Sequence, residues 1–502
     1  MNIKEAKQQL IHTVRAYLAR DEYGSWAVPV IAQRPILLMG PPGVGKTAIA
    51  EQAARECGVA LVSYTITHHT RQSAIGLPSI HTASYKDKSF QVTEYTMSEI
   101  IASVYRAMEE TGLEQGILFL DEVNCVSETL APAMLQFLQC KTFGAHQLPE
   151  GWVIVAAGNP PEYNRSVRDF DIVTLDRVRR IDVEAAYQPW KEYAYLRQVH
   201  PAVLAYLELK PQHFYQLETT VDGKRFATAR GWEDLSRLIS AHEQLGFGVD
   251  QALVEQYIQH PVIAKDFSAY YDLYLKYRSD YDVEAILSGH LTEQTVNRLR
   301  MAPFDERLSA LSLVLDALYR TCREANEEDA YVTALHQRLR SLMPRLSAGE
   351  GRSAVEQEVA AVDTLHWEKS RSKLLSLVEE RRLQRLERRL ADLRALVMDC
   401  DSSGADPADG VRAAFGVDVA RRKAAIENAS SRLERAFDLI DAAFGEGQEL
   451  VIFLTELTMN PYSMKFLADN GNARFASYNR ELLLDTKRSA ILNELQDIPQ
   501  IF

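Results

Sequence analysis

The feature that most constrains this chain is a glycine-rich turn that follows a short apolar run. Pro35–Met39 is apolar and stops at glycine, which is typical of a buried parallel strand. The turn, Gly40–Thr47 (GPPGVGKT), matches G-x-x-x-x-G-K-[ST] at every fixed position, and residues 48–58 have a helical pattern. Such a turn can match by chance, but the order strand, turn, helix is the setting that binds phosphate. The sequence therefore predicts an α/β core with a phosphate site.

The residue types of this turn suit a nucleotide phosphate group. Glycine has no Cβ to obstruct the backbone N–H groups that close around phosphate oxygens, and the following helix adds the positive end of its dipole. We expect Lys46 to reach the β- and γ-phosphates and the Thr47 hydroxyl to ligate Mg²⁺. The nucleotide-binding set that we expect is Gly40, Pro41, Pro42, Gly43, Val44, Gly45, Lys46, Thr47 and Ala48.

A second apolar strand ends in two carboxylates. Ile117–Leu120 is followed by Asp121 and Glu122. Strand ends are often acidic, so the pattern is weak by itself, but it becomes strong downstream of a phosphate loop. We expect Asp121 to hold Mg²⁺ with its water shell, and Glu122 to activate the attacking water as general base.

A third apolar strand, Val153–Ala157, leads to Asn159. The C-terminal ends of parallel strands line the ligand crevice, so Asn159 is placed to orient a water against the γ-phosphate. An Asn-Pro turn explains the same residues equally well. With Ala60–Thr65 as a further strand, strands alternate with helices and predict a parallel sheet.

Two arginine-containing segments follow. Leu175–Arg180 (LDRVRR) has three arginines within four positions. An arginine can neutralise charge on a transferred phosphoryl group, from its own subunit or from a neighbouring one. Ordinary ion pairs or a solvated helix end also explain a short basic run. Farther along, Arg230 begins an amphipathic stretch and would be unremarkable by itself.

Weaker signals divide the rest of the chain. Apolar spacing predicts an opening amphipathic helix, and β-forming residues around a polar centre predict a hairpin at about 81–96. From about residue 183 onward we expect no strand, because helical patterning dominates. We expect a nucleotide-binding core over residues 1–183, a helical lid and extension over 184–345, and a further helical region over 346–502.

The last region is organised by two short loops and one heptad seam. Residues 347–353 and 401–410 are rich in Gly, Ser, Asp or Pro, which is typical of loops. The seam consists of Leu383, Leu386, Leu390, Leu393 and Val397. It spans about two heptads, fewer than a coiled coil needs. We therefore predict a helical hairpin packed on its neighbour, or a short coiled coil, at about 365–445.

The composition disfavours several classes of protein. The net charge is −13, from 56 basic and 69 acidic residues, and broad nucleic-acid binding depends on basic residues, so nucleic acid is an unlikely partner. No segment approaches the ~18 apolar residues of a membrane span, so we expect no membrane partner and a cytoplasmic protein. The five cysteines have no CxxC spacing, which indicates neither a zinc site nor a disulfide framework.

In their order along the chain, these motifs resemble the AAA+ superfamily and, within it, the MoxR family. The strings are GPPGVGKT, LFLDEVN, VAAGNP, LDRV and TARGW, over residues ~30–240. Residues 64–78 and the hairpin that follows are similar to the helix-2 insert of that clade. The resemblance implies an AAA+ phosphate-loop core with a parallel sheet, followed by an α-helical lid.

The resemblance also assigns roles to three residues. It implies that Asn159 is sensor 1, that Arg177 is the arginine finger, and that Arg230 is sensor 2 on the lid. Val178 stands where the family has Phe, which leaves Arg179 and Arg180 as alternative fingers.

A function follows from the same resemblance. It implies ATP and Mg²⁺ as cofactors, a homo-oligomeric and hexameric ring, and chaperone-like action on a protein client with a von Willebrand factor A domain partner. A nucleic-acid-associated motor, a restriction-type subunit and a chelatase-like motor subunit are the alternatives. Intact Asp121, Glu122 and Asn159 count against a scaffold that barely turns over nucleotide. We expect residues 26–30 to pass near the base, although none of them specifies adenine.

Overall fold

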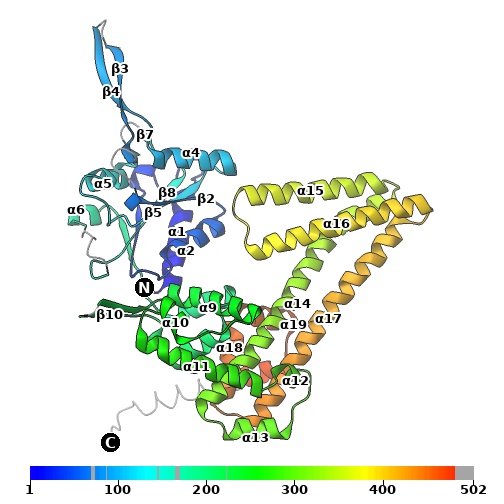
Figure 1. Cartoon of the computed structure of the whole chain (residues 1–502). Coiled ribbons are helices and arrows are strands. Elements are labelled where there is room, and N and C mark those ends of the chain that lie inside the picture. The colour runs from blue at the N-terminus through cyan, green and yellow to red at the C-terminus, as the bar shows by residue number, and fades with distance from the viewer. Residues whose placement is uncertain (69–73, 86–87, 144–145, 164–169, 222, 481–502) are drawn as a thin grey trace, which may run out of the picture.

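The computed structural model comprises an α/β core, a mainly helical segment beside it and a long helical arm (Figure 1). We call the segment from α7 to α13 (residues 187–301) the lid, and the arm consists of α14 to α17 (residues 304–443). It describes residues 1–68, 74–85, 88–143, 146–163, 170–221 and 223–480. A parallel sheet is followed by a mainly helical region, so the predicted fold class is confirmed. No helix in the described ranges is long and apolar enough to cross a membrane.

Five parallel strands form the central sheet, in the order β2-β5-β8-β1-β9. Their bounds are β1 Ile36–Met39, β2 Ala60–Thr65, β5 Gly116–Asp121, β8 Trp152–Gly158 and β9 Arg179–Asp182. The first four lie where apolar runs predicted strands. Strand β9 was not predicted, because Ile181 is its only buried residue and no apolar run marks this edge strand.

Helices cover both faces of the sheet. One layer contains α1 (Ile3–Leu18) and α2 (Lys46–Cys57), and the other contains α4 (Glu99–Thr111) and α5 (Ala131–Cys140). Successive strand residues point to opposite faces. Ile36 and Ile117 therefore pack with α1 and α2, whereas Leu37 and Leu118 pack with α4 and α5. Burial on both faces explains why these strands are apolar throughout.

An antiparallel hairpin projects from the core. Strand β3 (Pro78–Tyr85) pairs with β4 (Lys88–Tyr95), and the ribbon extends away from the sheet in Figure 1. It lies in the region where a hairpin was predicted, and residues 86–87 lie outside the described ranges. Every residue of β4 except Val92 is exposed, so this strand is not part of the core. The smaller elements of the core are η1 Val30–Ala32, η2 Ile66–His68, β6 Thr142–Phe143, β7 His146–Gln147 and α6 Ile172–Leu175.

The lid contains short helices and one hairpin. Its helices are α7 Tyr187–Leu196, α8 Pro201–Leu209, η3 Pro211–His213, α9 Ala229–Leu245, α10 Gln251–Tyr257, α11 Pro261–Asp280, α12 Val283–Leu287 and α13 Glu293–Met301. Between η3 and α9, β10 (Gln216–Thr220) pairs antiparallel with β11 (Gly223–Ala227). The prediction that no strand follows residue 183 is therefore wrong. No residue of β10 is buried, so the segment lacks the apolar alternation by which a half-buried strand is identified.

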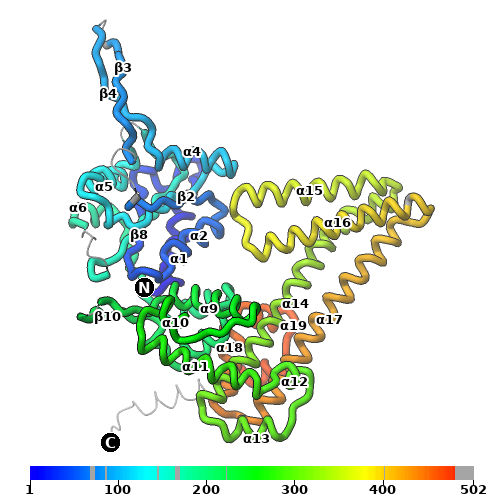
Figure 2. The backbone as a smooth tube through the Cα atoms, in the orientation of Figure 1, coloured from blue at the N-terminus to red at the C-terminus, as the bar shows by residue number. Residues whose placement is uncertain are grey.

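Long helices form the arm and its base. They are α14 Phe304–Ser347, α15 Gly351–Arg371, α16 Leu377–Ser403 and α17 Pro407–Ala443, with α18 Gln448–Met459 and α19 Pro461–Asn470 at the base. Figure 2 shows α14 and α17 running side by side, and α15 and α16 folding back toward the core. Four residues of the heptad seam, Leu386, Leu390, Leu393 and Val397, pack with buried residues of α14, α15 and α17, and Leu383 is also buried. Residues 348–350 and 404–406 connect the helices, so both loops are shorter than predicted.

The folded-back end of the arm contacts the core through α4. Arg371 donates to the carbonyl oxygen of Glu109 at 2.5 Å and to that of Glu110, and Lys373 lies 3.6 Å from the Glu110 carboxylate. The last carbonyl groups of a helix lack partners within the helix and carry partial negative charge. Two cations at the end of α4 therefore suit this position.

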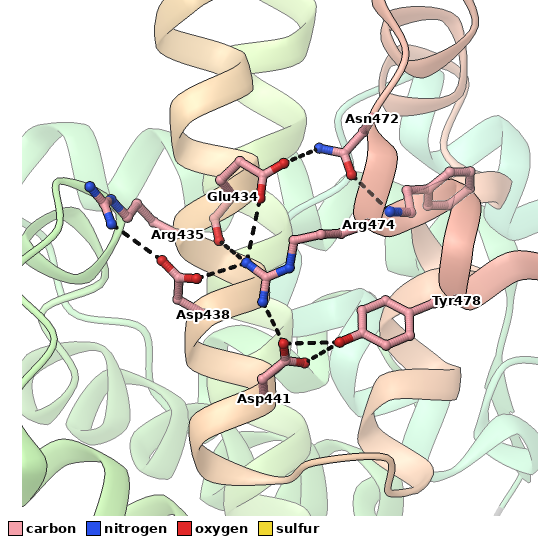
Figure 3. Close-up of polar contacts among 8 residues, drawn as sticks. Glu434, Arg435, Asp438, Asp441, Asn472, Arg474 and Tyr478 are labelled. Carbon is pink, nitrogen blue, oxygen red and sulfur yellow. Dashed lines mark hydrogen bonds and ion pairs between the residues drawn. The ribbon is translucent and has the colours of Figure 1, made fainter.

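The segment after α19 is held against α17 by an arginine (Figure 3). Arg474 donates to Asp438 Oδ1 at 2.7 Å and also pairs with Asp441. Tyr478 donates to Asp441 Oδ2 at 2.9 Å. The described chain thus ends packed on the base of the arm.

Candidate nucleotide site

The glycine-rich turn links β1 to α2 through positions that require glycine. Gly43 has a φ of 73° and Gly45 a φ of 101°, a region that residues with a Cβ rarely adopt. At Gly40, a Cβ would lie 2.5 Å from the carbonyl oxygen of Val183, where there is no room for a side chain. Helix α2 then begins at Lys46, so its free N–H groups face the space enclosed by the loop.

The Lys46 ammonium lies inside this loop, where it is buried. It donates to the carbonyl oxygens of Gly40 at 2.7 Å and Pro41 at 2.9 Å, and to Asn159 Oδ1 at 2.8 Å. None of these three acceptors carries a charge. Burial lowers the pKa of Lys46 to about 8, although the attraction of Asp121 opposes this shift. A phosphate would supply the negative charge that a buried ammonium group requires.

Thr47 and Asp121 bring two oxygen atoms together beside the loop. The Thr47 hydroxyl donates to Asp121 Oδ2 at 3.3 Å. Hydroxyl and carboxylate oxygens suit Mg²⁺, which takes few protein ligands and completes its shell with water and phosphate oxygens. No group of three His, Cys, Asp or Glu side chains in the described ranges could hold a metal by itself. The pair therefore fits a metal ion that binds together with a nucleotide.

Glu122 occupies a turn that few side chains adopt. Its φ is 56°, and its N–H donates to Asp121 Oδ1 at 2.9 Å. Its carboxylate accepts a hydrogen bond from the Thr67 hydroxyl at 3.0 Å. Backbone strain of this kind is common in active sites, where it aims a functional side chain. Sequence reasoning missed Thr67, because a single threonine after a strand has no distinguishing pattern.

Asn159 is held in place by a second asparagine. The Asn124 side chain donates to the carbonyl oxygen of Asn159 at 2.7 Å and accepts from its N–H at 3.3 Å. A Cβ at Gly158 would lie 2.7 Å from Asn124 Oδ1, so glycine is required for this contact. Asn124 is buried, and it was not assigned a role from the sequence because its partner lies 35 residues away.

A cavity of about 470 Å³ lies between the core and the lid. It is lined by Pro42–Ile49 of the loop and by Asp121, Glu122, Asn159 and Arg230. The rest of its wall comes from α1, α2, α7 and α9. The structure therefore brings together most of the predicted phosphate loop, both carboxylates, the asparagine and the lid arginine, whereas Gly40 and Pro41 of the predicted set do not line this cavity.

Arg230 enters this cavity from the start of α9. The N-cap residue Thr228 accepts the N–H of Gly231 at 3.2 Å, which fixes the helix terminus. A Cβ placed on Gly43 would lie 3.5 Å from Arg230 Cβ, so the lid touches the phosphate loop here. The positive charge of Arg230 also contributes to the lowered pKa of Lys46.

Arg177 lies outside the cavity. It is exposed and donates to Gln139 Oε1 of α5 at 2.6 Å. The other two arginines of this segment have other partners. Arg179 donates to Gln9 Oε1 at 2.8 Å, and Arg180 forms an ion pair with Asp182 at 2.8 Å. Within this subunit, none of the three arginines lines the cavity described above.

Part of the cavity wall comes from segments that the sequence did not assign to the site. Residues 26–30 were expected near the base, but none of them lines the cavity. Trp26 instead donates to Glu150 Oε2 at 3.1 Å and stacks under Arg20. This part of the wall is formed by α1 and α7, where Lys4 and Glu192 form an ion pair at 2.7 Å. This contact joins segments that are far apart in sequence, which local patterns do not reveal.

Comparisons with known proteins give one family match. Residues 36–174 match the family described as "ATPase family associated with various cellular activities (AAA)". No curated protein matches the chain. Among solved structures, the chain is similar to one described as "Crystal structure of FIGL-1 AAA domain in complex with ADP", with 16% identity and a TM-score of 0.23. That match covers 47% of this chain and 64% of the other chain's length.

Proposed function

We propose that this chain binds ATP with Mg²⁺ and hydrolyses it to remodel or assemble a protein client, because residues 36–174 match the AAA ATPase family. The observation that carries the proposal is the single cavity that contains Lys46, Asp121, Glu122, Asn159 and Arg230. Phosphoryl transfer depends mainly on positioning and on electrostatic stabilisation, and these groups supply both.

Each group in the cavity has a defined task in this proposal. Lys46 leaves Asn159 and binds the β- and γ-phosphates. Thr47 and Asp121 would hold Mg²⁺, which would neutralise charge on the phosphates. Glu122 accepts a proton from the attacking water, and Asn159 orients that water against the γ-phosphate. Arg230 contacts the γ-phosphate from the lid, so lid position and nucleotide state depend on each other.

We also propose that identical subunits form a ring, and the resemblance to the MoxR family favours a hexamer. Arg177 supports it, because an exposed arginine outside its own cavity can reach the cavity of a neighbouring subunit. We further propose a von Willebrand factor A domain protein as partner. The projecting β3–β4 hairpin offers a contact surface, since Leu77, Ile80 and Phe90 are large and exposed.

A nucleic-acid-associated motor is the second candidate. One observation favours it. In the described chain, Arg381, Arg388 and Arg394 of the arm form no ion pair with a carboxylate, although Arg385 and Arg389 of the same helix do. Unpaired arginines could bind phosphate groups of a nucleic acid.

Steady-state ATPase measurements test both candidates. Wild-type protein is compared with Lys46→Ala, alone and with single-stranded DNA, duplex DNA or RNA, and then with any protein that co-purifies. We expect hydrolysis that Lys46→Ala abolishes and that a protein partner stimulates. Stimulation by nucleic acid but not by protein would favour the second candidate. Wild-type protein that neither binds nor hydrolyses ATP would overturn the proposed activity.

A further inference from the structure

The hairpin that the sequence did not predict joins the lid to the core beside the nucleotide cavity. Tyr215 directly precedes β10, and its hydroxyl donates to the carbonyl oxygen of Pro42 at 3.1 Å. From β11, Lys224 donates to the carbonyl oxygen of Tyr163 at 3.0 Å. One contact reaches the phosphate loop, and the other reaches the segment that follows Asn159. The hairpin and the residue directly before it therefore contact both the phosphate loop and the segment that follows Asn159.

The contact with Pro42 has a consequence for the opposite side of the same peptide. In a trans peptide unit, the C=O of one residue and the N–H of the next point in opposite directions, and the described chain has no cis peptide. A hydrogen bond that fixes the Pro42 carbonyl therefore also fixes the direction of the Gly43 N–H. Pro42 and Gly43 both line the cavity, whereas Tyr215 does not. The tyrosine thus lies behind the loop, and the amide it orients belongs to the phosphate-facing side.

Gly43 is a position where such support matters. Because Gly43 has no Cβ, the peptide before it can rotate more freely than it could before any other residue. Its φ of 73° lies in a region that other residues rarely adopt. Pro42 has no N–H with which to tether the loop by itself. Burial raises the pKa of Tyr215, with a smaller contribution from Tyr163, so the hydroxyl keeps its proton and remains a donor.

We propose that Tyr215 is a positioning residue of the nucleotide site, which holds the Pro42–Gly43 peptide in its phosphate-binding orientation while the lid is closed. The lid then senses the phosphate loop directly, in addition to any contact that Arg230 makes with the nucleotide. By reciprocity, a nucleotide that fixes this peptide also favours the closed lid. The inference rests on the proposed nucleotide binding and hydrolysis.

Tyr215→Phe removes this one hydroxyl and keeps the ring. The hydrogen bond acts on phosphate binding in ground and transition states alike, so its loss should raise KM for ATP and Kd for ADP about threefold to tenfold. We expect kcat to stay within about twofold of wild type. Steady-state kinetics and ADP binding by calorimetry measure both quantities.

Tyr270→Phe is the matched control. Its hydroxyl forms a hydrogen bond of 3.1 Å with Ser309 Oγ, the same length as that of Tyr215, but it lies in the lid away from the phosphate loop. We expect Tyr270→Phe to change neither KM nor Kd. Equal shifts in both variants, or no shift in Tyr215→Phe, would overturn the inference. A lower kcat with unchanged Kd in Tyr215→Phe would also contradict it, because the hydroxyl would then act in turnover and not in phosphate binding.

Hydrogen exchange of the lid provides a second readout. In wild-type protein, ADP should slow amide exchange in residues 187–196 and 229–245, since binding favours the closed lid. Tyr215→Phe at saturating ADP should show less of this protection, whereas Tyr270→Phe should show all of it. Full protection in Tyr215→Phe would overturn the coupling. Absence of ADP binding in wild-type protein would instead reject the proposed function, which keeps the two failures distinct.

Discussion

The α/β core and the helical arm differ in what their buried residues do. In the core, Lys46 and Asn159 are polar side chains that meet at the ends of neighbouring strands. In the arm, the buried residues are mostly Leu, Val and Ala, and charged residues pair with one another, as Arg389 does with Asp418 at 2.7 Å. The core therefore depends on residue type at fixed backbone positions. The arm depends on shape and packing, which many apolar sequences satisfy.

Helix α7 connects these two regions because its two faces have different neighbours. Tyr193 and Leu196 line the nucleotide cavity. On the other side, Lys191 is buried, lies 2.6 Å from the Glu208 carboxylate and also pairs with Glu456 of α18. Tyr195 donates to the same Glu456. Packing at the base of the arm is thus one helix away from the nucleotide site.

Arg177→Ala should have the largest effect, because the arginine is proposed to act in a neighbouring subunit. We expect nucleotide binding to persist and hydrolysis to fall by ~10³–10⁵. A mixture with Glu122→Gln protein should regain part of the activity, since some interfaces then combine an intact Glu122 with an intact Arg177. Turnover of the mixture after verified subunit exchange is the measurement. A mixture that stays inactive, or loss of activity in Arg179→Ala alone, would show that the finger is assigned wrongly.

Glu122→Gln, in the core, should cause the second largest fall in the rate of hydrolysis. It keeps the shape of the side chain but removes the general base, so we expect hydrolysis to fall by ~10²–10⁴ with little change in ATP affinity. Single-turnover hydrolysis and equilibrium binding of ATP separate the two effects. Near-normal turnover would remove Glu122 from the role of base and weaken the contrast between core and arm.

Lys191→Met tests the junction between the two regions. The Lys191 side chain is 3% exposed and that of Glu456 is 9% exposed, so removing one partner leaves an uncompensated buried charge. We expect a loss of ~3–5 kcal/mol in the free energy of unfolding, measured with denaturant. The double variant Lys191→Met/Glu456→Met should recover much of this loss.

An exposed ion pair of α19 provides the control for that comparison. Lys465 and Asp469 pair at 2.5 Å, with side chains 52% and 49% exposed, so Lys465→Met should cost less than ~1 kcal/mol. Equal losses in the free energy of unfolding at Lys191 and Lys465 would mean that the buried ion pair stabilises the protein no more than the exposed one.

The pH dependence of nucleotide binding should show a smaller effect than the loss of the buried ion pair. Burial lowers the pKa of Lys46 to about 8, and only its ammonium form attracts phosphate. Nucleotide affinity should therefore be level below pH 8 and about tenfold weaker at pH 9 than at pH 7. Lys46→Arg keeps its charge throughout this range, so whatever affinity it retains should not show the decline. Binding isotherms of ADP at several pH values measure this.

The stability of the protein should respond to this lysine in the opposite direction. Between about pH 8 and its ordinary pKa of 10.5, Lys46 carries more protons in the unfolded chain than in the folded one. Its contribution to the free energy of unfolding therefore increases as pH rises through this window. Loss of affinity without loss of stability would assign the decline to the Lys46 ammonium and not to unfolding.

Much of the core could be predicted from the sequence, because its signals are local. The run before Gly40 and the run before Asp121 are apolar since both faces of their strands are covered. Strand β9 and the β10–β11 hairpin were missed because their residues are largely exposed or half-buried. Asn124 and Thr67 were missed because their roles depend on a partner that is distant in sequence.

The sequence alone predicted the phosphate loop and the two carboxylates, since glycine, lysine and aspartate suit phosphate and Mg²⁺ there for physical reasons that do not depend on the rest of the fold. Only the tertiary structure decided which elements close the cavity, that Arg177 lies outside it, and that Tyr215 lies behind the loop. These facts follow from how helices and hairpins pack across long sequence separations. Packing of that kind is governed by shape and burial, and a one-dimensional pattern records neither.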